Sequence, residues 1–133
     1  MGTQTTHWTE RPTLLHRPAT ATDSLETRMA MQQTNAYAVR VFLDHTPLPA
    51  TSMVARPERV HVTLAEVDDL EPWLETLGGR ITVREADESG VEMWTLRTKL
   101  PADSYSEAIH VWVHVPVVEG ELVLHAIRTA VAA

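Results

Sequence analysis

The sequence predicts an α+β domain: a mainly antiparallel sheet of about six strands packed against one short helix, residues 68–78, with an extended N-terminal arm. Two observations predict this class. Apolar residues recur at every second position through residues 109–117 and in five further stretches, as in strands with one buried face. In residues 70–77 they recur instead at i, i+3, i+4 and i+7, which is typical of an amphipathic helix.

Length and composition indicate one globular domain and exclude several chemistries. At 133 residues, with 44% hydrophobic and 22% charged residues, the chain is long enough to bury a core. The 18 acidic and 11 basic residues give a net charge of −7, so we expect no nucleic-acid partner. The absence of cysteine excludes disulfides, thiolate metal sites and cysteine nucleophiles. Without an apolar run of roughly 20 residues or a signal-peptide core, we expect a cytoplasmic protein without membrane contact.

The first part of the chain is interpreted as an arm, a strand and a loop. Residues 1–35 are expected to be extended or partly disordered, with room for a short helix that begins at Asp23 or Ser24. Residues 36–133 are expected to form the single α+β domain. Alternating apolar residues predict a strand over residues 36–43. Residues 44–57 contain three prolines and predict a loop.

The middle of the chain is predicted to contain a strand, the helix and a hairpin. Residues 58–64 alternate like a strand, and Gly78 can end the following helix in a left-handed conformation. Two further strands then flank a turn at Asp87-Glu88-Ser89-Gly90 and form a hairpin. If these four residues form the loop, Val83 faces Trp94 and Ile81 faces Leu96.

The last part of the chain predicts a second hairpin with an unusual outer face. Residues 109–117 place β-branched apolar residues on one side, and a turn at Glu119-Gly120 leads into a strand over residues 121–127. Counting back from this turn sets His114 opposite His125. The other side of the hairpin, too apolar for a solvated surface and too polar for a core, is the candidate interface. Its residues are His110, Trp112, His114, Val123, His125 and Ile127.

Histidines are the only abundant candidates for metal ligation, with seven in the chain. His110 and His114 lie four residues apart in one strand, roughly 13 Å, which is too far for one ion. The paired His114 and His125, about 5 Å apart at Cβ, can bind an ion if His61, Glu92 or Glu85 adds a third ligand. The other interpretation is two neutral imidazoles on the sheet, and we expect no metal or other cofactor.

Residues 61–79, HVTLAEVDDLEPWLETLGG, resemble the strand, Asp-Leu and helix-Leu-Gly opening of the vicinal oxygen chelate (glyoxalase/bleomycin-resistance) family. The order strand, helix, strand, strand, strand over residues 58–118 is also similar to that family's βαβββ module. The resemblance implies a metal- or ligand-binding protein in which His61 is the metal ligand of the first strand. The chain departs from the family pattern in its shorter helix and in the lack of a glutamate at the centre of the last strand.

No motif for nucleotide, zinc-protease or serine-hydrolase chemistry occurs in the sequence. The leading hypothesis is therefore a non-catalytic binding or regulatory protein that acts through protein–protein contacts on the candidate interface. The expected partner is a second copy of the chain, with a dimer favoured, or another protein. The alternative hypothesis is a small metal- or ligand-binding enzyme of the vicinal-oxygen-chelate type that uses His61 or the His114–His125 pair.

Overall fold

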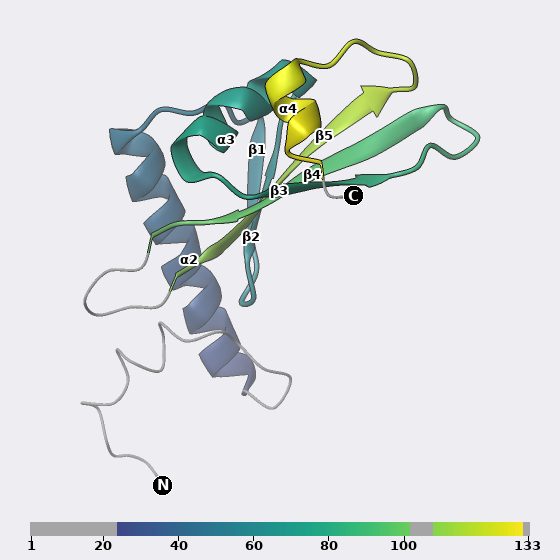
Figure 1. Cartoon of the computed structure of the whole chain (residues 1–133). Helices are drawn as coiled ribbons and strands as arrows, with labels where there is room; N and C mark the ends of the chain where they lie inside the picture. Colours follow the sequence, from purple (N-terminus) through teal and green to yellow (C-terminus); the bar gives the residue numbers. More distant parts are fainter. Residues whose placement is uncertain (1–23, 102–107, 132–133) are drawn as a thin grey trace, which may run out of the picture.

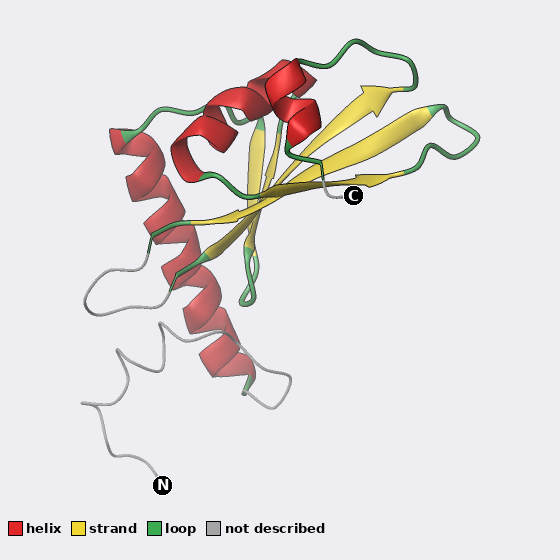
Figure 2. Ribbon diagram, viewed as in Figure 1, coloured by secondary structure: helices red, strands yellow, loops and turns green. Residues whose placement is uncertain are grey.

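Helices pack on one side of a five-stranded sheet in the computed structural model, which describes residues 24–101 and 108–131 (Figure 1 and Figure 2). The predicted α+β class is confirmed. The elements are, in chain order, α2 (Leu25–His45), β1 (Ser52–Ala55), β2 (Val60–Thr63), the 3-10 helix η2 (Val67–Asp69), α3 (Leu70–Leu77), β3 (Arg80–Arg84), β4 (Val91–Lys99), β5 (His110–Val118) and α4 (His125–Thr129).

The sheet is mixed, with the strand order β1-β2-β5-β4-β3. β2 and β5 run parallel, whereas the other three pairings are antiparallel. The prediction of a mainly antiparallel sheet is thus correct for most pairings. The predicted numbers, about six strands and one helix, are not exact, because the described residues form a five-stranded sheet and more than one helix. The parallel pairing places β5 in the centre of the sheet, between β2 and β4.

The core lies between one face of the sheet and the helices α2, α3 and α4. The alternate valines of β5 from Val111 to Val117 are 0–1% exposed, as the period-two pattern predicted. One side chain or more from each α-helix joins them in a single apolar cluster. Its most buried members are Val60, Val62, Ile81, Leu96, Val111, Val113, Val115 and Val117 from the sheet, with Val39 from α2, Leu70 and Trp73 from α3, and Ile127 from α4.

α2 replaces the strand predicted for residues 36–43, and that prediction is wrong. The Ser24 hydroxyl caps the helix by accepting a hydrogen bond from the backbone N–H of Thr27 at 3.1 Å. Apolar residues at helical spacing also occur in residues 36–43. The polar Asn35 interrupts the apolar stripe of the helix, so the stripe is difficult to recognise in the sequence. The buried stripe recurs at every fourth residue: Met31, Asn35 and Val39.

The helix and the hairpin in the middle of the chain are confirmed. η2 and α3 together cover residues 67–77, and the chain leaves the helix at Gly78 with φ of 70°. β3 and β4 pair in the predicted register, with Val83 opposite Trp94 and Ile81 opposite Leu96. The predicted loop before β2 contains the edge strand β1 instead.

The chain after β5 does not form a strand, so the predicted final hairpin is wrong. β5 already pairs with β2 on one side and with β4 on the other, which leaves no free backbone edge for residues 121–127. The chain turns at Gly120, where φ is 88°, and enters α4, which buries Ile127 in the core. His125 therefore lies on α4 and does not pair with His114.

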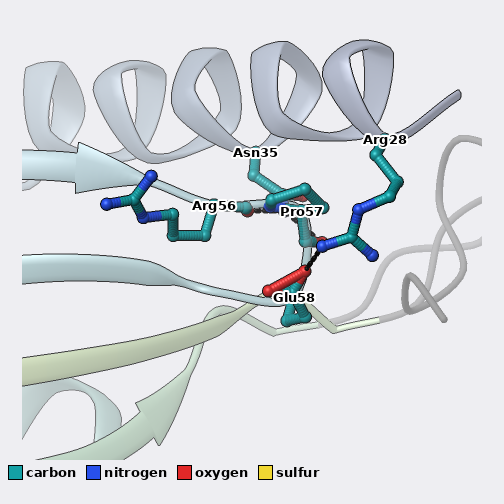
Figure 3. A network of polar contacts seen from close by, with 5 residues as sticks. All are labelled: Arg28, Asn35, Arg56, Pro57 and Glu58. Carbon is teal, nitrogen blue, oxygen red and sulfur yellow. Dashed lines mark hydrogen bonds and ion pairs between the residues drawn. The ribbon is translucent and has the colours of Figure 1, made fainter. Parts of the chain in front are cut away.

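α2 also holds the turn between β1 and β2 (Figure 3). Asn35 Nδ2 donates hydrogen bonds to the backbone carbonyls of Arg56, at 3.0 Å, and Pro57, at 3.1 Å. Arg28 Nη2 donates to Glu58 Oε2 at 2.6 Å and forms an ion pair with it. These contacts fix the backbone that leads into β2.

In the described part of the chain, no helix is long and apolar enough to cross a membrane. The cytoplasmic location stays a prediction. The predicted N-terminal arm lies outside the described residues up to residue 23.

Candidate functional site

The candidate site is the sheet face that no helix of the described ranges covers, which we call the open face. Its side chains alternate with the core side chains along each strand, so the strand register determines which residues share it. They are Ser52 and Val54 of β1, His61 and Thr63 of β2, His110, Trp112, His114, Pro116 and Val118 of β5, Val91, Met93, Thr95, Arg97 and Lys99 of β4, and Arg80, Thr82 and Arg84 of β3.

The open face is positively charged although the whole chain is acidic. Its strand positions carry the cations Arg80, Arg84, Arg97 and Lys99 and no Asp or Glu, whereas the net charge of the chain is −7. No ion pair joins any of these four cations to a carboxylate among residues 24–101 and 108–131. Their charge is therefore available to an external anion.

Trp112 lies at the centre of this face between two arginines. The guanidinium carbon of Arg59, just before β2, lies 4.0 Å from the centre of the Trp112 ring, and that of Arg97 on β4 lies 4.3 Å from it. β2 and β4 flank β5, so the two guanidiniums come from opposite sides of the tryptophan. Both contacts have cation–π geometry, which fixes long arginine side chains while their in-plane N–H groups stay free to donate.

A chain of hydrogen bonds runs beside Trp112. His61 Nδ1 lies 2.9 Å from His114 Nε2, and His114 Nδ1 lies 2.8 Å from Thr95 Oγ1. The two imidazole rings, called the histidine pair below, are stacked with 15° between their planes. Both also meet the Trp112 ring edge to face, with centroids 5.9 Å and 6.4 Å away. Trp112, the histidine pair and Thr95 thus form one connected polar and aromatic cluster.

The environment of the histidine pair favours its neutral form. Partial burial lowers the pKa of His61 below 6.5, and the positive charges of Arg59 and Arg56 lower it further against a smaller opposing effect of Glu58. Partial burial likewise lowers the pKa of His114, with repulsion from His61 and Arg84 in addition. Burial and the neighbouring arginines therefore both disfavour the charged imidazolium form.

The structure corrects the predicted metal ligands. His114 lies next to His61 and not next to His125. His61 was a candidate because of the family resemblance and His114 because of the expected hairpin, and the fold makes these two residues neighbours. Among the residues that the structure describes, no group of three His, Cys, Asp or Glu side chains is arranged to hold a metal ion. A structural metal site of four protein ligands is therefore not present in these residues.

The six residues predicted for the interface do not share one surface. His110, Trp112 and His114 lie on the open face as predicted. Val123 lies in the loop before α4 and packs against the core, His125 is exposed on α4, and Ile127 is fully buried. These last three are misplaced in the prediction because it assigned a strand to residues 121–127.

Several residues of the site were not singled out from the sequence. Alternation along β4 already places Thr95 and Arg97 on the side opposite the core, which could have indicated them. Arg59 lies just before β2, two residues ahead of His61, so the alternation places both on the same side. Only the parallel pairing of β2 with β5 brings Arg59 to Trp112.

Comparisons with protein-family models, curated proteins and solved structures found no match to this chain. The order strand, helix, strand, strand, strand that the vicinal-oxygen-chelate resemblance implied is present from β2 to β5. The metal site that the same resemblance implied stays a prediction.

Proposed function

We propose that this chain is a non-catalytic binding protein whose open face binds an acidic segment of another protein. The observation that carries the proposal is the cluster of Arg59, Trp112 and Arg97, which combines a large aromatic side chain with two guanidiniums that have no carboxylate partner in the described ranges. Tryptophan and arginine dominate the binding energy of protein interfaces.

Charge selects an acidic partner. Guanidiniums held against an aromatic ring can bind carboxylates through paired N–H donors, and they lose less conformational entropy on binding than free side chains. Arg84 and Lys99 extend the positive surface along the neighbouring strands. An acidic segment laid across the strands would neutralise several of these cations at once.

Charge also disfavours other occupants of the face. A nucleic acid would meet a chain whose net charge is −7, so long-range repulsion would oppose its approach. A symmetric dimer through the open face would bring together two surfaces that both carry Arg80, Arg84, Arg97 and Lys99, so their like charges would repel. The predicted homo-oligomer is therefore better sought at a different surface, and light scattering tests it directly.

Selection from a random peptide library displayed on phage tests the proposal. We expect the purified protein to enrich acidic peptides and Trp112→Ala to enrich none of them. Leu122→Ala is the matched control, because Leu122 is 91% exposed in the loop before α4, away from the open face. Binding that is lost at high salt is expected as well. Enrichment without acidic residues, or equal enrichment on Trp112→Ala, would contradict the proposal.

A second candidate function is the binding of a divalent metal ion by the histidine pair. The facing nitrogens are 2.9 Å apart, and two ligands of one ion at about 2.0–2.1 Å each need a similar separation. Water or a substrate would have to complete the coordination. Thermal unfolding with added Zn²⁺ or Ni²⁺ tests it: a stabilisation abolished by His61→Ala supports this function, and an unchanged melting temperature excludes it.

A further inference from the structure

An open hollow of about 410 Å³ lies on the open face beside the histidine pair. It spans β3, β4 and β5, so three strands contribute to its wall. The polar and cationic side chains that line it are Thr82, Arg84, Thr95, Arg97 and His114, together with the apolar Met93.

The lining of this hollow is suited to an anion. Arg84 and Arg97 are exposed, come from different strands and form no ion pair in the described ranges, although Arg84 also attracts the exposed Asp87 carboxylate of the β3–β4 loop. Two threonine hydroxyls add neutral donors, and no acidic side chain lines the space. Guanidiniums next to hydroxyl donors are the groups that bind carboxylate and phosphate oxygens in proteins.

We propose that the hollow is an oxyanion site, in which a carboxylate or phosphate group binds between Arg84 and Arg97 and accepts a hydrogen bond from Thr95. This inference rests on the proposed function in one respect only, namely which molecule supplies the anionic group. If the partner is an acidic protein segment, the group is a glutamate or aspartate carboxylate. If it is a small ligand, the group is a phosphate or a free carboxylate.

A bound oxyanion would orient the hydrogen-bond chain beside it. To donate its proton to the anion, Thr95 must accept from His114 Nδ1–H at the observed 2.8 Å contact. His114 Nε2 is then an acceptor and takes the hydrogen bond from His61 Nδ1–H at 2.9 Å. In this arrangement the anion sets the tautomers of both histidines, and Nε2 of His61 is unprotonated.

Sulfate is the best first probe because it stays a dianion around neutral pH. We expect NMR titration of the full-length protein with sulfate to shift the His114 and Thr95 signals. Arg84→Gln should weaken sulfate binding about tenfold, the effect of one charge-assisted hydrogen bond. Arg128→Gln, an exposed arginine on α4, is the charge-matched control and should bind like the wild type.

Two further measurements keep the inference separate from the proposed function. Glutarate and inorganic phosphate, titrated in the same way, distinguish a carboxylate from a phosphate preference. Equal sulfate affinity in the wild type and Arg84→Gln would overturn the oxyanion site even if Trp112-dependent acidic peptides are selected. Sulfate binding that depends on Arg84 without any selected peptide would keep the site and reject the protein partner.

Discussion

Replacing Trp112 by alanine should cost far less stability than replacing Trp73 by alanine. Trp112 is only partly buried, and truncation removes its cation–π interactions with Arg59 and Arg97 and its edge-to-face contacts with the histidine pair. Each cation–π interaction is worth about 0.5–1 kcal/mol at an exposed site and each edge-to-face contact about 0.5 kcal/mol, so the expected loss of unfolding free energy is about 2–3 kcal/mol. The valines on the core side of β5 are untouched by the change.

Trp73 provides the matched comparison from the core. It is 0% exposed and its indole N–H donates to the Pro49 carbonyl at 2.7 Å. Truncation of such a side chain leaves a cavity and costs about 3–5 kcal/mol, with about 1 kcal/mol more for the lost hydrogen bond. At about 4 °C per kcal/mol for a chain of this size, the melting temperature should fall by about 8–12 °C for Trp112→Ala and by about 16–24 °C for Trp73→Ala.

Urea unfolding followed by far-ultraviolet circular dichroism measures both variants on the same scale. Light scattering on the same samples reports whether either change alters the mass of the protein. If Trp112→Ala loses as much free energy as Trp73→Ala at an unchanged mass, the chain itself covers the ring, and the open face is not a binding surface.

Three further predictions concern stability. Because the pKa values of the histidine pair are lowered in the folded state, the unfolded chain binds more protons below pH 6.5, and the free energy of unfolding should fall as the pH drops through that value. The limit is about 1.4 kcal/mol per pH unit for each ring, reduced by solvent screening, and a pH-independent urea midpoint from pH 7 to about 5 would refute it. Asn35→Ala should cost about 1–3 kcal/mol by leaving two carbonyls of the β1–β2 turn unpaired, whereas the exposed Gln33→Ala on the same helix should cost under about 0.5 kcal/mol. Gly79→Ala would set a Cβ 2.5 Å from the Arg97 carbonyl oxygen. It should therefore lower the free energy of unfolding by about 1 kcal/mol more than Gly120→Ala, because Gly120 also has a positive φ but has open space around it. Equal melting temperatures of the two variants would show that β3 and β4 can move apart.

The elements that the sequence predicted correctly depend on local patterns. Val83 and Trp94 face one another because four loop residues fix the hairpin register, and both the loop and the alternation are visible in the sequence. The strand over residues 110–118 follows in the same way from its alternating valines. α2 was missed because Asn35, a polar residue, occupies a buried position in order to hold the β1–β2 turn. A tertiary contact determines that position, and no local pattern reveals it.

The candidate site was predicted in its parts but not in its assembly. Alternation placed His61, Trp112 and His114 on outward positions, and each was named as a candidate. Their association depends on the parallel pairing of β2 with β5. This pairing brings together the two histidines of the pair, which are 53 positions apart in the sequence. The sequence contains no local signal for such a pairing, because parallel strands are connected through a distant crossover. The assignment of a strand after Gly120 then gave His114 the wrong neighbour.

The most direct test of the binding face is an NMR map of the contact with a selected acidic peptide. The account predicts that the indole signal of Trp112 and the backbone signals of β4 and β5 shift on titration of the labelled protein, while those of α3 and α4 do not. Shifts that cluster on α3 or α4 and leave Trp112 unchanged would contradict the account.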